Sequence, residues 1–131
     1  MATEPMIDHI DHFVLTVRSL DVTCAFFSAC LGMKRVDTPG SPTALHFGTQ
    51  KINVHETDHT FEPKAAKPTP GSADFCLITT TPLGEVINRL ENHGVPIELG
   101  PVDRIGALGS MTSVYFRDPD HNLVEVSRYG H

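Results

Sequence analysis

Four side chains of this 131-residue sequence could together hold a divalent metal ion. His12 and His55 offer imidazole nitrogens, while Asp74 and Glu125 offer carboxylate oxygens. This mixed set of ligands suits Ni²⁺, Co²⁺, Fe²⁺, Mn²⁺ or Zn²⁺, and ligand type alone does not rank these ions. A metal with open positions could polarise two neighbouring oxygens of a substrate, and a carboxylate could then move a proton beside a carbonyl.

The four side chains occupy related places in a sequence that repeats itself. A shift of 62 residues places residues 12–15 on residues 74–77. With a longer loop allowed in the second copy, residues 54–56 fall on residues 124–126. Duplicated units that share one sheet surface bring equivalent positions close to a pseudo-two-fold axis. The repeat therefore predicts that the two histidines and the two carboxylates meet.

The first copy, about residues 7–56, has the pattern of a strand, a helix and three further strands. Residues 12–17 alternate along the chain and are rich in strand-forming residues. Residues 20–32 place apolar side chains at helical spacing, with Asp21 near the start and Gly32 at the end. Three short strands follow, at residues 34–37, 43–48 and 51–56.

The second copy, about residues 73–128, repeats this plan. The predicted elements are a strand at 73–80, a helix at 82–92, and strands at 96–99, 112–117 and 122–128. Residues 100–110 contain several glycines and are interpreted as a loop that could act as a lid over a site. The copies are joined by residues 57–72, a linker with three prolines. The fold prediction is one α+β domain of two tandem βαβββ modules, forming a curved mixed sheet around a cavity with helices outside.

The alternation of side chains along the strands indicates which residues face that cavity. In each strand that carries a candidate ligand, the larger apolar residues share the other face and can pack against a helix. Asn53 shares the face of His55, whereas Glu56 points the opposite way. Two arginines, Arg104 and Arg117, could hold an anionic substrate. The remaining histidines have no counterpart in the repeat and are interpreted as solvated or structural.

Bulk properties narrow the possible partners. A net charge of −6 argues against nucleic acid, whose phosphates attract basic surfaces. No apolar run is long enough to span a bilayer, and the first residues lack the pattern of a signal peptide. The three cysteines include Cys76, interpreted as a small buried apolar side chain. An odd number of thiols favours a reduced, cytoplasmic protein.

Several motifs give the chain a resemblance to a known superfamily. The two βαβββ units, the strand start at residues 11–14 and the ending at residues 116–125 resemble the vicinal oxygen chelate superfamily, over roughly residues 7–128. That group includes glyoxalase I, fosfomycin-resistance thiol transferases, extradiol dioxygenases and bleomycin-binding proteins. A narrower resemblance, through residues 50–56, 61–66 and 116–120, is to glyoxalase domain-containing protein 5.

The resemblance implies a metal held by residues from the first and last strands of each module. His12 and Glu125 match two of these positions. Asp74 stands where the family usually has histidine, and the position of a glyoxalase I glutamate is left to His55 or Asn53. The resemblance also implies a small-molecule substrate, a homodimer, and Tyr115 as a residue that contacts substrate. Glu125 is the candidate base.

Three functions follow from these residues. The first is a metal-dependent enzyme of the glyoxalase I type, acting on a small oxygenated substrate such as a hemithioacetal. The second is a relative of the extradiol dioxygenases or thiol transferases. The third is a non-enzymatic module that sequesters a small molecule, as resistance proteins do. Metal content discriminates between them, since the third needs no ion.

Overall fold

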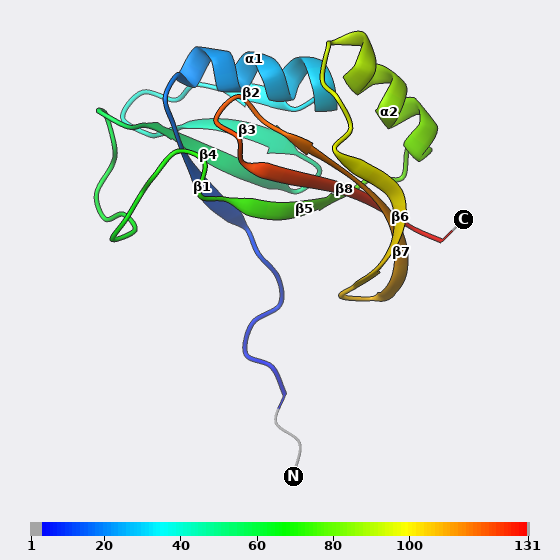
Figure 1. The fold of residues 1–131 in the computed structure, drawn as a ribbon. Helices are drawn as coiled ribbons and strands as arrows, with labels where there is room; N and C mark the ends of the chain where they lie inside the picture. The colour runs from blue at the N-terminus through cyan, green and yellow to red at the C-terminus, as the bar shows by residue number, and fades with distance from the viewer. Residues whose placement is uncertain (1–3, 131) are drawn as a thin grey trace.

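The structure, a computed structural model, describes residues 4–130 and contains two helices and eight strands (Figure 1). In chain order the elements are β1 (His12–Val17), α1 (Leu20–Leu31), β2 (Lys34–Val36), β3 (Thr43–Phe47), β4 (Gln50–Glu56), β5 (Asp74–Ile78), α2 (Leu83–Asn92), β6 (Leu99–Gly106), β7 (Gly109–Arg117) and β8 (Leu123–Tyr129). The βαβββ pattern thus occurs twice, as the repeat predicted.

Each module forms its own four-stranded mixed sheet. Sheet A has the strand order β1-β4-β3-β2, and sheet B has the equivalent order β5-β8-β7-β6. The first strand of each module is an edge strand and pairs in parallel with the last strand of that module. The other pairs are antiparallel. The predicted α+β fold with paired modules is confirmed.

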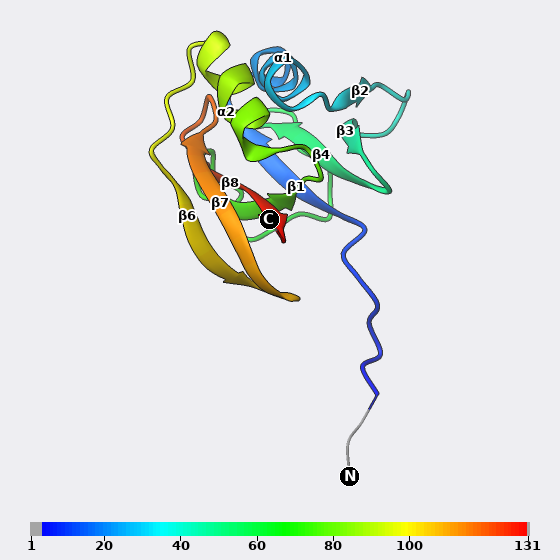
Figure 2. The same cartoon turned by 90° about the vertical axis from the view of Figure 1, so that its right-hand side faces the viewer.

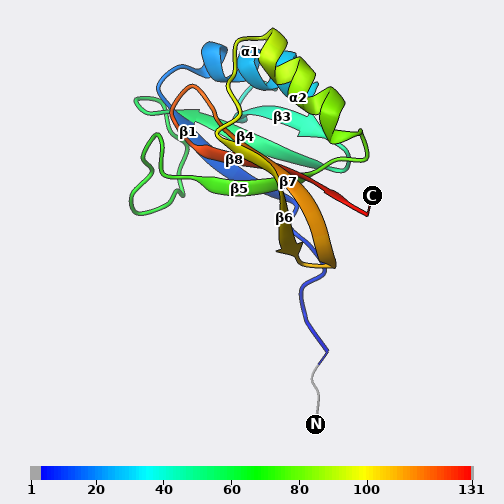
Figure 3. The ribbon, with the colours of Figure 1, turned by 45° about the vertical axis from the view of Figure 1, so that its right-hand side comes forward.

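Both helices lie on the same side of the sheets, next to each other (Figures 1 and 3). Between helices and sheets lies one apolar core, whose fully buried side chains include Phe27, Leu45, Leu90, Phe116 and Val124. The opposite surface of each sheet, called here its helix-free face, carries the alternate residues of every strand. The candidate ligands lie on these helix-free faces.

Helix α1 begins at Leu20, where the sequence predicts it, but its capping residue is different. The hydroxyl of Ser19, not Asp21, caps it by accepting a hydrogen bond from the backbone N–H of Val22 at 3.2 Å. Glu56 accepts a second bond, from the N–H of Leu20 at 2.8 Å. Gly32 ends the helix at φ 71°, a conformation that favours glycine. Glu56 therefore points to the helix side, as the alternation predicted.

The predicted lid at residues 100–110 is wrong, because this segment forms most of the long β6–β7 hairpin (Figure 2). The predicted strand at residues 96–99 overlaps the hairpin only at Leu99. A register shift lies between Leu99 and Val102. Gly100 sits in it at φ 115°, where an added Cβ would meet the carbonyl oxygen of Ser113 at 2.5 Å. Glycine is needed there because the two backbones approach closely.

The linker at residues 57–72 folds back over the helix-free face of sheet A. Its Phe61 ring lies 5.4 Å from the His55 ring, centroid to centroid. Residues 4–11, in contrast, extend away from the body of the molecule in all three views (Figures 1–3). Neither described helix has the length and hydropathy to cross a membrane.

Candidate functional site

The helix-free face of sheet A carries three of the candidate residues. His12 begins β1, is exposed, and its Nδ1 lies 2.8 Å from a carboxylate oxygen of Asp11. Parallel pairing places Asn53 beside Val14 and His55 beside Thr16. The parallel register between β1 and β4 therefore aligns polar groups of both strands on one surface.

Asn53 and His55 are buried polar groups without full hydrogen bonding. They are 8% and 4% exposed, and no described residue makes a hydrogen bond to Asn53 Oδ1 or His55 Nδ1. Burial lowers the pKa of His55, and the nearby charge of Lys64 lowers it further. His55 also lines a small cavity of about 140 Å³ under the linker. Two such atoms on one strand face are unusual and indicate a place where a ligand could bind.

The helix-free face of sheet B holds Glu125 in a connected polar network. The Ser127 hydroxyl donates to Glu125 Oε2 at 3.1 Å. Ser113 Oγ lies 2.6 Å from Ser127 Oγ, so Ser113 is left as the donor of that bond. The sulfur of Cys76 lies 3.1 Å from the same Ser127 oxygen. This network orients the Glu125 carboxylate, which itself is only partly buried.

Cys76 lies on the exposed part of this face, so its predicted burial is wrong. Strand β5 is an edge strand, and nothing in sheet B covers its outer side. Desolvation of the sulfur raises the pKa of the thiol, and the charge of Glu125 raises it too. The thiol is therefore protonated at neutral pH and acts as a hydrogen-bonding group rather than a nucleophile.

Tyr115 and Arg104 form a pair next to Glu125. Antiparallel pairing sets Tyr115 directly opposite Glu125. Arg104 Nε donates to the Tyr115 hydroxyl at 2.9 Å, and its guanidinium lies 5.4 Å from the centre of the Tyr115 ring. Arg104 remains exposed, with no carboxylate among the described residues paired to it. The charge of Arg104 thus lies against a phenol that stands opposite the Glu125 carboxylate.

Arg117 is placed differently from Arg104. It donates to both carboxylate oxygens of Glu98, at 2.9 and 3.1 Å. This bidentate bond raises the pKa of Arg117 and lowers that of Glu98. Because its charge is already paired, Arg117 is less available to an anion than Arg104 is.

His12 and Asp74 approach each other between the two modules. They are the first residues of the edge strands β1 and β5, and both line one cavity of about 430 Å³. The neighbouring rings of Phe13 and Phe75 are in contact, with centroids 4.9 Å apart. The repeat correctly placed His12 and Asp74 at equivalent positions, facing a common space.

The strand register corrects the second predicted equivalence. In sheet B, Glu125 pairs with Cys76, two residues after the start of β5. The residue two after the start of β1 is Val14, which pairs with Asn53. Asn53 is therefore the structural counterpart of Glu125. His55 lies two residues further on, because hydrogen-bond register and not sequence spacing sets the equivalence.

Within residues 4–130 of one chain, no three His, Cys, Asp or Glu side chains gather closely enough to hold a metal ion. The donors instead form two half-sites: one on sheet A with His12, Asn53 and His55, and one on sheet B with Asp74 and Glu125. A complete set of ligands would need two such half-sites to face each other.

Comparison with known proteins identifies relatives along nearly the whole chain. The sequence profile of the Glyoxalase/Bleomycin resistance protein/Dioxygenase superfamily matches residues 9–126. The virulence protein STM3117 of Salmonella typhimurium (strain LT2) is 49% identical over 124 residues, covering 95% of this chain and 86% of that protein. The glyoxalase domain-containing protein RDO1 of Mycosarcoma maydis is 43% identical over 120 residues, covering 92% of this chain and 68% of that protein.

Solved structures agree with this relationship. The crystal structure of STM3117 superposes with a TM-score of 0.93 at 48% identity, covering 96% of this chain and all of that one (100%). Lactoylglutathione lyase from Agrobacterium tumefaciens superposes with a TM-score of 0.71 at 26% identity, covering 95% and 96% of the two chains. The fosfomycin resistance protein FosX from Mesorhizobium loti, at 15% identity and a TM-score of 0.64, shares the fold over 95% of both chains.

Proposed function

Since this chain belongs to the Glyoxalase/Bleomycin resistance protein/Dioxygenase superfamily, we propose that it is a metal-dependent enzyme of the glyoxalase I type. Its substrate would be a small oxygenated molecule such as a hemithioacetal. The observation that carries the proposal is the pair of half-sites. On sheet B, Glu125 is held in a hydrogen-bonded network. On sheet A, Asn53 Oδ1 and His55 Nδ1 are buried without hydrogen-bond partners. The similarity to a lactoylglutathione lyase at 26% identity supports this reaction class.

The proposed metal ligands are His12, His55, Asp74 and Glu125. Their nitrogen and oxygen donors suit a divalent ion such as Ni²⁺, Co²⁺, Zn²⁺, Mn²⁺ or Fe²⁺. The unpartnered Nδ1 of His55 fits this role, and the equally unpartnered Oδ1 of Asn53 is its competitor for the position on β4. When bound, the ion would act as a Lewis acid for two neighbouring substrate oxygens.

The chain's own residues would bind the substrate and move the proton. Glu125 is the proposed base, because Ser127 orients its carboxylate and leaves part of it exposed. Tyr115, directly opposite, would donate a hydrogen bond to a substrate oxygen. Arg104 would pair with an anionic group of the substrate, with Arg117 and Asn53 as further contacts.

We further propose that the enzyme is a homodimer. Apolar side chains remain exposed on the helix-free faces, with Val14 45% exposed, Ile78 55% and Leu99 46%. Sheet A of one copy facing sheet B of its partner would cover these side chains. The same contact would also bring the two half-sites together. A two-fold axis would then generate two equivalent metal sites per dimer.

The experiment that tests the function is metal analysis by elemental mass spectrometry. Protein purified without tags or chelators is reconstituted in turn with each of the five ions. The expected result is about one tightly bound ion per chain, and loss of about 100-fold in affinity in His12→Ala and Glu125→Ala. Glu91→Ala, at an exposed position on α2, is the matched control. Unchanged binding in both ligand variants would refute the site.

Mixing the two inactive variants tests whether the site is shared between copies. In an equal mixture about half of the dimers contain one copy of each variant, and each of these dimers has one intact site. Metal capacity should therefore recover to about a quarter of the wild-type value. Sites formed within single chains would show no recovery. Light scattering after size-exclusion chromatography tests the dimer itself, and a monomer mass would refute it.

A second candidate function is a binding module that sequesters a small molecule without a metal. Two replacements favour it. Asp74 stands where the family usually has histidine, and Asn53, a neutral amide, is the register counterpart of Glu125. If none of the five ions binds in stoichiometric amount, these replacements have removed the metal site and the binding module becomes the better conclusion.

A further inference from the structure

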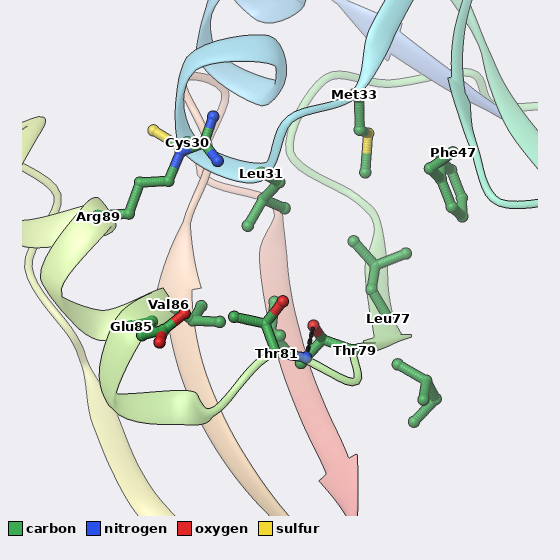
Figure 4. Close-up of a pocket in the computed structure, with 12 residues that line it drawn as sticks. Cys30, Leu31, Met33, Phe47, Leu77, Thr79, Thr81, Glu85, Val86 and Arg89 are labelled. Atoms are coloured by element: carbon green, nitrogen blue, oxygen red, sulfur yellow. Dashed lines mark hydrogen bonds between the residues drawn. The ribbon is translucent and has the colours of Figure 1, made fainter.

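A groove on the helix side of the molecule lies between the two modules. It has a volume of about 370 Å³ (Figure 4). Its walls come from both modules: Leu31, Met33 and Phe47 from the first, and Leu77, Val86 and Val126 from the second. Its volume lies at the lower end of the range for small-molecule sites.

Sheet B separates the groove from Glu125, and the groove adjoins the cavity of His12 and Asp74 at Phe47 and Leu77. Leu77 and Val126 pair with each other on the helix side, while Cys76 and Glu125 pair on the helix-free face. Side chains of neighbouring strand residues point to opposite surfaces. A molecule in the groove would therefore contact the reverse side of the strands that carry Cys76 and Glu125.

Arg89 closes one end of the groove and is not free to bind a ligand. From α2 it reaches across to the end of α1, where its Nε donates to the Ala29 carbonyl at 2.8 Å and Nη2 to the Ser28 carbonyl at 3.5 Å (Figure 4). These carbonyls lie in the last turn of a helix, where partial negative charge accumulates. Two of its N–H groups are therefore already used, and its charge lies at the negative end of the α1 dipole.

Glu85 provides the charge that is still available. It lines the groove one turn before Arg89, and Figure 4 shows it below that side chain on the same helix. Glu85 makes no ion pair with any residue in the described part of the chain. The hydroxyls of Thr79 and Thr81 lie on the same wall. The groove thus combines an apolar floor with an unpaired carboxylate.

From this combination we infer that the groove binds a small amine with an apolar body, such as a single ring on a short chain. The ring would pack on Leu31, Leu77 and Met33, and the protonated nitrogen would face Glu85. A carboxylate on the same body would be repelled by Glu85 and by the net charge of −6. The site is a binding site only, and no reaction is assigned to it.

The test compares two probes with the same phenylethyl body and opposite charge, 2-phenylethylamine and 3-phenylpropionate. Binding is followed by methyl NMR on the full chain. The amine should give saturable shifts at Leu31, Leu77 and Met33, with a dissociation constant of about 1 mM or below. The acid should bind at least about fivefold more weakly. No saturable shifts, equal affinities, or shifts centred instead on the face of Glu125 would overturn the inference.

Three variants sharpen this result. Glu85→Gln keeps the shape of an exposed side chain and should weaken amine binding about fivefold while leaving the acid no weaker. Glu91→Gln, on the same helix but outside the groove, makes the same charge change and should have no effect. Thr81→Phe, at an exposed position, should fill the groove and block both probes. Equal losses in Glu85→Gln and Glu91→Gln would overturn the inference.

Discussion

The two modules share a strand order but differ in whether the polar side chains on their helix-free faces are hydrogen-bonded. On sheet B the polar groups are satisfied, since Ser113, Ser127 and Glu125 form a continuous network. On sheet A the linker covers the part of the face that carries His55, and Asn53 and His55 keep unpartnered buried atoms. Leaving such an atom unpaired costs about 1–3 kcal/mol.

This difference separates two ways of building a site. Module two holds its carboxylate in a fixed orientation before any ligand arrives, which is preorganisation. Module one instead gives up stability at Asn53 and His55, and a ligand or ion that bonds to these atoms would recover it. The same duplicated fold therefore supplies one rigid half-site and one half-site that is complete only when occupied.

The largest difference between the modules is expected when the turn before the last strand of each module is mutated and the free energy of unfolding is measured. In module two the buried Asp118 accepts hydrogen bonds from the N–H groups of Asp120 and Asn122 and from the Asn122 side chain, at 2.8–2.9 Å. Asp118→Ala should lower the free energy of unfolding by about 3 kcal/mol, because three donors lose their partner. Thr49→Ala, in the corresponding exposed turn of module one, should change it by less than about 0.5 kcal/mol.

Urea denaturation of both variants measures this difference. The slope of the transition should be unchanged, so that the shift in midpoint reports stability alone. Similar losses in the two variants would show that the turn of module two is not held by Asp118.

A smaller difference in unfolding free energy is expected between mutating a hydrogen-bonded polar group on sheet B and mutating an unpartnered one on sheet A. Ser127→Ala removes bonds to Ser113, Cys76 and Glu125 and should cost about 1–2 kcal/mol of unfolding free energy. Asn53→Leu, of similar volume, should be neutral or stabilising in metal-free protein, because it removes an unpaired buried amide. Thermal unfolding after treatment with a chelator measures both. A loss above about 2 kcal/mol in Asn53→Leu would mean that its amide already has a partner.

The smallest expected effect is on the pH dependence of stability, through His55. The pKa of His55 lies below its usual 6.5 because burial and Lys64 disfavour its charged form. Between that depressed pKa and 6.5 the folded protein binds fewer protons than the unfolded chain, so stability rises with pH across this window. Stability should therefore fall as pH drops below 6.5 in metal-free protein, and less steeply in His55→Leu.

Denaturation midpoints between pH 7 and pH 5 check this prediction. Ile52→Val is the matched control, since it alters the packing of the same strand on its other face and removes no titrating group, and it should keep the wild-type slope. Identical slopes in wild type and His55→Leu would show that burial of this imidazole does not contribute to acid sensitivity.

Much of the fold could be predicted from the sequence, because its signals are local. Alternation predicted β1 and β5, and helical spacing with a final glycine predicted α1. Residues 100–110 were wrongly predicted to form a loop, because glycine is common both in loops and where two backbones approach closely. Gly100 serves the second purpose, and only cross-strand pairing with β7 makes the segment a strand.

For the candidate site, the types of candidate ligand, their alternation to one face of each strand, and the equivalence of His12 and Asp74 could be read from the sequence. Those features depend on residue identity and on a backbone period of two. Only the three-dimensional contacts show that Asn53 corresponds to Glu125, that Arg104 contacts Tyr115 while Arg117 pairs with Glu98, and that the candidate ligands divide between two sheets. Register, ion pairing and the covering of a face arise from contacts between segments far apart in sequence, and no local pattern encodes them.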